Sequence, residues 1–228
     1  MTRSCFVTGT DTEIGKTLIA CALLHAYRDK GLTAVGMKPV AAGASRGKAG
    51  PVNDDVEALV DASSVAAGRD LVNPYLFADP VAPHIAAAGE QRTIDPSHIV
   101  ACYRQLAALA DVVVVEGVGG FRVPLGERFD TADLACRLAL PVVLVVGMRL
   151  GCINHALLTA EAIRSRKLVC AGWIANQVDP HMQRQAENIA ALDDLLGMPR
   201  IGTVEYLRPP DAAVAATRLR LPDQLLAG

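Results

Sequence analysis

The fold is decided by residues 9–17, which read Gly9-Thr10-Asp11-Thr12-Glu13-Ile14-Gly15-Lys16-Thr17. The apolar run at 4–8 predicts a strand before this stretch, and the helical spacing of apolar residues at 16–30 predicts a helix after it. Consecutive backbone N–H groups at the start of a helix form an anion cradle, which the helix dipole strengthens. Gly15 permits close approach of a phosphate, Lys16 can reach β- and γ-phosphates, and the Thr17 hydroxyl can bind Mg²⁺.

The stretch departs from the strict phosphate-loop pattern at one position. That pattern, G-x-x-x-x-G-K-[ST], requires glycine at position 10, whereas this chain has Thr10 and places Gly9 one residue early. The alternative is a chance Gly-Lys-Thr in a surface turn. Because the three residues lie between a predicted strand and a predicted helix, we interpret the stretch as a P-loop.

Outward from this loop, short apolar strands alternate with helical patterns. We expect further strands at 33–38, 111–116, 141–147, 168–176 and 201–204, and helices at 55–62, 96–110, 131–138, 155–166 and 183–196. Continuously apolar strands are buried on both faces, and strand–helix alternation implies parallel pairing. The sequence therefore predicts an α/β fold of P-loop NTPase type, with a parallel β-sheet flanked by helices on both faces. Without a linker or repeat, residues 1–228 are expected to form one domain.

Two stretches do not fit this alternation. Residues 40–53 contain three glycines, and residues 73–91 contain Pro74, Pro80, Pro83 and Gly89. Both are predicted to be long loops, which in compact domains are usually functional.

Composition excludes several classes of protein. The 228 residues carry a formal net charge of −2 and only 4% aromatic residues, which argues against nucleic acid or an anionic membrane as a partner. The apolar run near the N-terminus is shorter than the roughly 7–15 residues of a signal peptide. Six scattered cysteines without a C-x-x-C pair favour reduced core residues. We expect a cytoplasmic protein.

Charged residues follow the predicted strands. Glu116 ends an apolar strand, where open α/β sheets bind ligands, and can bind Mg²⁺, although a surface acid would fit there too. Lys38 ends the second strand. It can be interpreted either as a solvated lysine at a strand end or as a second cation that binds the transferred phosphoryl group. Asp54 and Asp55 start a helix, which capping alone explains equally well. Asn176 follows a predicted strand and can be interpreted either as a side chain that hydrogen-bonds the edge of a purine or as an ordinary turn residue.

Several segments together resemble the dethiobiotin synthetases. They are the phosphate loop, Lys38-Pro39-Val40, Val115-Glu116-Gly117-x-Gly119-Gly120 and Leu150-Gly151-Cys152-Ile153-Asn154-His155, with Asn73-Pro74-Tyr75, Pro83-His84 and Ala171-Gly172-Trp173-x-Ala175-Asn176 in support. The similarity extends over residues 3–207. The loop alone is shared by many P-loop proteins, whereas the other segments in this order are much more specific.

The resemblance implies a chemistry. Members of the family convert 7,8-diaminopelargonate (7,8-diaminononanoate), CO₂ and ATP into dethiobiotin, ADP and phosphate in biotin biosynthesis. One amine carries CO₂ as a carbamate, which attacks the γ-phosphorus to give a carbamic–phosphoric anhydride. The second amine then displaces phosphate and closes the ring.

The resemblance also assigns residues to roles. The catalytic set is Thr12, Glu13, Lys16 and Lys38, and the Mg²⁺ ligands are Thr17, Asp55 and Glu116. ATP is bound by Glu13, Ile14, Gly15, Lys16, Thr17, Leu18, Asp55, Glu116, Gly117, Val118, Gly119, Asn176, Gln177, Val204, Glu205, Tyr206 and Leu207. The substrate is bound by Thr12, Lys38, Gly151, Cys152, Ile153 and Asn154. The last four hold the substrate carboxylate across the interface of a homodimer, although helix capping by Asn154 is the plainer interpretation.

Two departures from the family pattern are Ala42, where many members have serine, and Glu205, where proline is usual. With Ala42 a hydroxyl contact to substrate or phosphate is missing. Glu205 bears on the nucleotide contacts expected of residues 204–207. The alternative function is a regulatory ATPase with a deviant P-loop. Such proteins typically carry a lysine early in the loop, which Thr10-Asp11-Thr12 does not supply.

Overall fold

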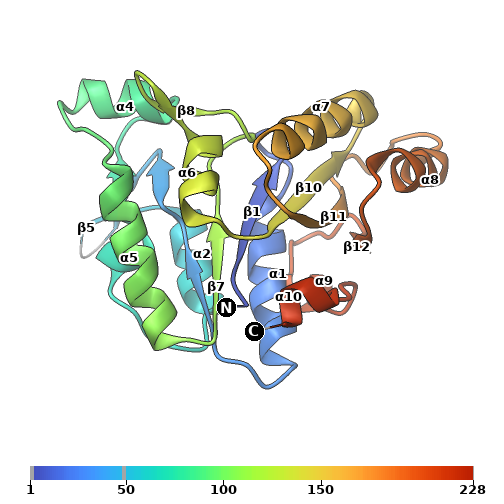
Figure 1. Ribbon diagram of the computed structural model, residues 1–228, viewed down its shortest axis with the longest axis horizontal. Helices are drawn as coiled ribbons and strands as arrows, with labels where there is room; N and C mark the ends of the chain where they lie inside the picture. Colours follow the sequence, from blue (N-terminus) through green and yellow to red (C-terminus); the bar gives the residue numbers. More distant parts are fainter. Residues whose placement is uncertain (1–2, 48–49, 228) are drawn as a thin grey trace.

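A computed structural model of the chain describes residues 3–47 and 50–227. Its centre is a six-stranded sheet in the order β12-β11-β10-β1-β7-β2, and every neighbouring pair is parallel (Figure 1). The strands are β1 (Cys5–Gly9), β2 (Ala34–Met37), β7 (Val112–Glu116), β10 (Val142–Met148), β11 (Cys170–Gln177) and β12 (Arg200–Val204). The predicted parallel sheet is confirmed.

Both faces of the sheet are covered, and the sequence of β7 shows how. Val113 and Val115 enter one hydrophobic cluster, whereas Val112 and Val114 enter the other. The first cluster includes α5 (Pro96–Leu109), α6 (Thr131–Leu138), α7 (Cys152–Ser165) and α8 (Gln185–Leu196). The second includes α1 (Lys16–Arg28), α2 (Asp54–Ala62), α9 (Ala212–Ala216) and α10 (Asp223–Leu226). Successive side chains alternate faces, so a strand covered on both sides needs an unbroken apolar run.

The predicted helix boundaries need correction at several ends. The helix predicted at 155–166 begins earlier, at Cys152, because Gly151 at φ 94° is its N-cap. The helix predicted at 55–62 begins at Asp54 because the Asn53 side chain accepts from the Val56 N–H. The other shifts, at α1, α5 and α8, amount to one or two residues at an end.

The two predicted loops contain regular structure, which corrects the prediction. Residues 40–53 form β3 (Val40–Ala42), β4 (Ser45–Gly47) and β5 (Gly50–Val52), while residues 73–91 form β6 (Tyr75–Phe77) and α4 (Pro83–Gly89). Residues 48 and 49 of the first stretch lie outside the described part. β3 pairs with β6 in parallel, and β4 with β5 in antiparallel fashion. Three-residue strands are too short to show a period, so proline and glycine dominate the sequence signal.

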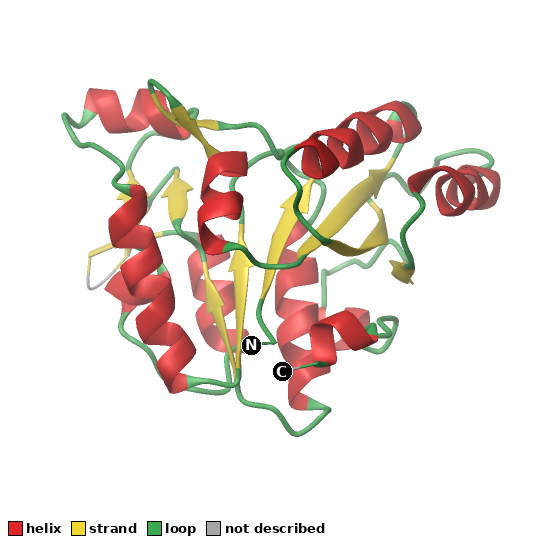
Figure 2. Ribbon diagram, viewed as in Figure 1, coloured by secondary structure: helices red, strands yellow, loops and turns green. Residues whose placement is uncertain are grey.

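Other short elements were also missed. They are α3 (Arg69–Val72), which precedes β6, and the hairpin of β8 (Pro124–Gly126) and β9 (Phe129–Asp130). In Figure 2 the strands point toward the edge at which α4 and this hairpin lie on one side and α7 on the other. These elements therefore enclose the carboxyl edge of the sheet.

The cysteines match the prediction of reduced core residues. All six are free; Cys5, Cys21, Cys102 and Cys152 are buried, and Cys136 and Cys170 are half-buried. In the part of the chain that the structure describes, no helix combines the length and apolar character required to cross a bilayer.

Gly36 in β2 gives a test of how α2 packs on the sheet. A Cβ at this position would lie 2.9 Å from Cβ and Cδ2 of Leu59, which is fully buried. We expect Gly36→Ala to destabilise the fold by about 1–3 kcal/mol through overpacking, and Leu59→Ala by about 2–5 kcal/mol through a cavity. In the double variant the new methyl group occupies space vacated by leucine. The loss of unfolding free energy, measured by urea denaturation, should therefore be smaller than the sum of the two single losses.

The matched control is Gly89→Ala, whose added methyl meets no atom within 4 Å and should not destabilise. If the costs of the Gly36 and Leu59 substitutions add to within about 0.5 kcal/mol, the two residues are not in the described contact.

Candidate active site

The phosphate loop joins β1 to α1 at the carboxyl edge of the sheet. Glu13 and Gly15 both adopt left-handed conformations, with φ 58° and 79°. A Cβ on Gly15 would lie 2.2 Å from Nδ2 of Asn176, so a larger residue would clash as well as be strained. A Cβ on Gly9 would lie 2.6 Å from Cδ1 of Ile14. Gly9, which stands one residue before the glycine of the strict pattern, therefore allows the loop to pack against its own Ile14.

Two further contacts hold the loop. Asn176 is buried, and its Nδ2 donates to the carbonyl oxygen of Ile14 over 2.8 Å. Arg149, which follows β10, forms an ion pair with Asp11. The Nζ of Lys16 donates to the carbonyl of Asp11 over 2.7 Å, so the lysine lies folded over the loop. The sequence did not single out Arg149, because an arginine after a strand carries no pattern of its own.

Lys38 lies at the centre of a compact ionic cluster. Its Nζ is 2.5 Å from Oε1 of Glu116 and 2.8 Å from Oδ2 of Asp55. The Thr17 hydroxyl donates to the same Oε1 of Glu116 over 2.9 Å. Lys38 and Glu116 are only 4% and 0% exposed, so the solvated-strand-end interpretation of Lys38 is wrong. The cluster joins the ends of β2 and β7 to the starts of α1 and α2.

Charge and burial set the pKa values of this cluster. Burial would lower the pKa of Lys38, but the carboxylates of Glu116 and Asp55 outweigh it and raise that pKa. Burial would raise the pKa of Asp55, but Lys38 outweighs burial and lowers it. Burial lowers the pKa of Lys16 to about 8, against the attraction of Glu116. Lys38 therefore remains a cation and Asp55 a carboxylate at neutral pH.

The structure separates Asp55 from Asp54. Asp55 lines the cavity described below and contacts Lys38, whereas Asp54 is exposed and does not line it. Asn53 caps the helix, so capping does not account for Asp55.

The residues at this point fit a magnesium ion. Thr17, Asp55 and Glu116 present one hydroxyl and two carboxylates, the hard oxygen donors that Mg²⁺ prefers, and Mg²⁺ commonly keeps several waters. Among the described residues, Oε2 of Glu116 is buried without a hydrogen-bond partner, which a cation would supply. No group of three or more His, Cys, Asp or Glu that could hold a metal occurs in the described ranges, so a site built only from such side chains is not indicated.

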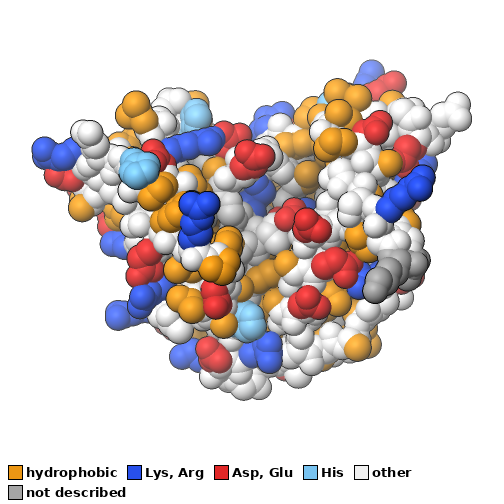
Figure 3. Space-filling model, turned by 180° about the vertical axis from the view of Figure 1, so that it is seen from behind, with side chains coloured by type: hydrophobic (Ala, Val, Ile, Leu, Met, Phe, Trp, Pro, Cys, Tyr) orange, Lys and Arg blue, Asp and Glu red, His pale blue; other side chains and the backbone are white. Residues whose placement is uncertain are grey.

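A cavity of about 920 Å³ opens over the cluster. Its floor includes Lys16, Thr17, Lys38, Asp55 and Glu116. Figure 3 shows the surface hollowed along its upper edge, between two projecting parts of the molecule. The cavity is also lined by Thr12, Glu13, Gly15, Ala41, Ala42, Asn53, Pro80, Val81, Ala82, Pro83, Val118, Gly119, Arg122, Val123 and Pro124. The structure thus brings together the predicted catalytic set and the predicted metal ligands around one cavity.

The remaining residues expected to bind ATP do not line this cavity. Gln177 ends β11, and its Oε1 accepts from the Tyr206 N–H over 3.3 Å, so the two predicted segments are neighbours. Glu205 is half-exposed and pairs with Arg218 at 2.8 Å. Ile14 and Val204 are buried, Leu18 and Leu207 are packed on the core, and Gly117 follows β7.

Residues 151–154 lie at the start of α7 and are not among the residues that line the cavity. Gly151 is the N-cap and makes no side-chain cap hydrogen bond, so the prediction of capping by Asn154 is wrong. Leu150, directly before it, is 94% exposed. Within the segment, Gly151 and Asn154 are exposed, whereas Cys152 is buried.

Other residues of the site were missed by sequence reasoning. Asn73 donates from Nδ2 to the carbonyl of Lys38 over 2.6 Å and so fixes its backbone. Residues 80–83 and Arg122 form part of the cavity wall, although the sequence had predicted no role for them in the site. No local pattern marks Arg122, which lies six residues after Glu116.

Similar solved structures indicate the fold. The MinD cell division protein of Aquifex aeolicus has a TM-score of 0.57 at 15% identity, covering 93% of this chain and 86% of that one. A ParA family ATPase of Chlorobium tepidum TLS has a TM-score of 0.58 at 10% identity, covering 100% of both chains. These likenesses confirm the P-loop NTPase type of fold.

Sequence comparisons are more specific. A family model described as an AAA domain matches residues 3–213. The ATP-dependent dethiobiotin synthetase BioD of Aromatoleum aromaticum is 59% identical over 220 residues, which are 96% of this chain and 98% of the relative. The protein of the same name from Janthinobacterium sp. (strain Marseille) is 53% identical over 222 residues, or 96% and 94% of the two chains. The chain belongs to the dethiobiotin synthetase family.

Proposed function

We propose that this chain, acting as one domain, is an ATP- and Mg²⁺-dependent cyclo-ligase that converts 7,8-diaminopelargonate and CO₂ into dethiobiotin. The observation that carries the proposal is the Lys38–Glu116–Asp55–Thr17 cluster beside the phosphate loop. Its support is 59% identity to a relative named as an ATP-dependent dethiobiotin synthetase. The ligase activity and its place in biotin biosynthesis follow from that name.

The phosphate end of the reaction needs charge neutralisation and positioning more than covalent chemistry. The loop N–H groups and Lys16 hold the β- and γ-phosphates of ATP. Mg²⁺, bound by Thr17, Asp55 and Glu116, would neutralise charge on the phosphates. Residues 176–177 and 204–207 hold the adenine, with Glu205 fixed by its ion pair to Arg218.

The diamine end begins with a carbamate. One amine attacks CO₂ and loses a proton, which gives an N-carboxylate that Lys16 and Lys38 hold by charge. A carbamate oxygen then bonds to the γ-phosphorus, and the bond to ADP breaks. The second amine attacks the carbonyl carbon, inorganic phosphate leaves, and a proton is released as the cyclic urea closes. Thr12 and Glu13, both exposed to the cavity, lie between nucleotide and diamine.

The substrate site is completed by a second copy of the chain. We infer a homodimer in which residues 151–154 of the partner bind the substrate carboxylate with N–H groups at the start of α7. The exposed Leu150 and Leu158 beside this segment, at 94% and 58%, support an apolar contact there. We place the reaction in the cytoplasm, which the six free cysteines support.

The regulatory ATPase is the alternative. The solved structures that share the fold include MinD and ParA family ATPases, but at 10–15% identity their likeness carries the fold alone. A cavity that combines buried cations with apolar wall residues suits an anionic carbamate on a hydrocarbon stem better than a switch that binds nucleotide alone.

The decisive measurement is phosphate release from Mg·ATP, with and without 7,8-diaminopelargonate and bicarbonate. We expect release only when the diamine and the carbon source are both present, together with a product of dethiobiotin mass. Phosphate release that is indifferent to the diamine would favour the regulatory ATPase.

The two lysines should differ in what they do for stability. Lys16→Gln and Lys38→Gln are each expected to lose most turnover, because both cations serve the transferred phosphoryl group. Lys16 donates to a backbone carbonyl, so its loss should change the free energy of unfolding by less than about 1 kcal/mol. Lys38→Gln leaves the fully buried Glu116 unpaired and should cost about 3–5 kcal/mol.

Urea denaturation without Mg²⁺ measures this difference. The control is Lys38→Gln with Glu116→Gln, which removes both charges and should recover most of the stability but none of the activity. Wild-type stability in Lys38→Gln would contradict the described ion pair, and full activity in either single variant would remove that lysine from the mechanism.

A further inference from the structure

Arg122 is a cavity residue without a role in the reaction described so far. It follows the loop after Glu116 and lines the cavity with Lys16 and Lys38. Those lysines are 6% and 4% exposed, whereas the Arg122 side chain is 59% exposed. Two cations therefore lie at the floor of the cavity and a third at its mouth.

The structure fixes the backbone on both sides of Arg122. The buried Thr131 hydroxyl donates to the carbonyl of Phe121 over 2.6 Å and accepts from the N–H of Val123 over 3.0 Å. The N–H of Thr131 donates in turn to the carbonyl of Val123 over 3.0 Å. One residue at the start of α6 thus holds both neighbours of the arginine in place.

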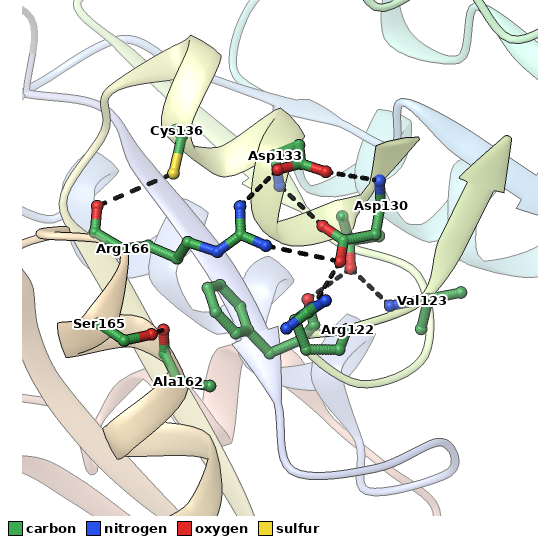
Figure 4. Close-up of polar contacts among 10 residues, drawn as sticks. Arg122, Val123, Asp130, Asp133, Cys136, Ala162, Ser165 and Arg166 are labelled. Atoms are coloured by element: carbon green, nitrogen blue, oxygen red, sulfur yellow. Dashed lines mark hydrogen bonds and ion pairs between the residues drawn. The ribbon is translucent and has the colours of Figure 1, made fainter. Parts of the chain in front are cut away.

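The guanidinium is held from the same place. Nε of Arg122 lies 2.5 Å from Oδ2 of Asp130, the residue before Thr131 (Figure 4). Asp130 is itself anchored, because Oδ1 accepts from the N–H of Asp133 over 2.9 Å in a capping box. Arg166 at the end of α7 pairs with Asp133 and lies 3.9 Å from Asp130. A second arginine thus shares the negative charge of this cluster.

This arrangement leaves the outer part of the Arg122 fork available. Its one ion pair uses Nε, and among the described residues Nη1 and Nη2 have no hydrogen-bond partner. A guanidinium that is positioned through Nε and open at its two terminal nitrogens matches the two oxygens of a carboxylate.

Part of the cavity wall is apolar. It includes Ala41, Val81, Ala82, Pro83, Val118 and Val123. Such a surface suits a hydrocarbon stem and offers nothing to a phosphate chain. The cavity therefore combines two buried cations, an apolar part of its wall and one exposed cation.

We propose that Arg122 determines specificity for the substrate by binding its carboxylate, while the carbamate formed at the other end lies against Lys16 and Lys38. The proposal rests on the function proposed above, since it places the tail of the same substrate. Arg122 acts within one protomer and adds to the N–H groups that the partner's α7 supplies. A nucleotide phosphate is the less suitable ligand, because the loop and Lys16 already hold phosphates at the floor.

The test is steady-state kinetics of Arg122→Gln with 7,8-diaminopelargonate and with its methyl ester, which keeps both amines but lacks the negative charge. For the natural substrate we expect KM to rise about 10- to 50-fold, the loss of a charge-assisted hydrogen-bonded pair, with kcat changed less than threefold. For the ester KM should change less than threefold. The preference of the wild type for the acid over the ester should thus fall by about the same factor.

Three variants complete the experiment. Arg128→Gln removes the same charge from the exposed turn of the β8–β9 hairpin, where Arg128 does not line the cavity, and should leave KM unchanged. Arg122→Lys keeps the charge but not the fork and should be intermediate. Asp130→Asn weakens the anchor and should raise KM for the acid in the same direction. Thermal unfolding of each variant shows that the fold is kept.

The outcomes separate this proposal from the one beneath it. A wild type that turns over the diamine, with Arg122→Gln retaining the full preference for the acid, overturns the role of Arg122 alone. The role of Arg122 is also overturned if Arg122→Gln raises KM equally for the acid and the ester, or if it raises KM for ATP instead. A wild type that does not turn over the diamine at all overturns the proposed function and this inference with it.

Discussion

The ion pair of Lys38 with Glu116 is the contact on which the site depends. Both side chains are almost fully withdrawn from water, where an unpaired charge would be very unfavourable. The cation comes from the end of β2 and the anion from the end of β7, while Asp55 and Thr17 join from the starts of α2 and α1. The cluster can form only if these four elements meet at one edge, so folding and assembly of the site are one event.

Close backbone packing sets the geometry around this pair. Gly15 leaves room for the Asn176 amide, which bonds the loop from β11, and Gly36 lets β2 lie against Leu59 of α2. Glycine serves a different purpose at each position: a left-handed conformation in the loop and close approach in the strand. The phosphate loop is therefore held by a strand two places along the sheet as well as by its own sequence.

Much of this was predictable from sequence because the signals are local. An unbroken run such as Val112–Glu116 predicts a strand buried on both faces, and a Gly-Lys-Thr before a helix predicts the anion cradle. The short elements β3 and β6 were missed because each is three residues long and is stabilised by pairing with the other. Burial of Lys38 was equally hidden, since a lysine at a strand end looks solvated until its two carboxylates are placed beside it.

Arg122 shows where sequence patterns stop being informative. Nothing in Gly120-Phe121-Arg122-Val123 distinguishes a surface arginine from one held at a cavity mouth. The difference lies in Asp130 and Thr131, eight and nine residues later, which hold the guanidinium and the backbone on both sides of it. Both residues belong to the start of α6, where a capping box fixes Asp130 for reasons of helix stability. A device that begins a helix thus also positions a charge, which is how an ordinary structural element can come to carry substrate specificity.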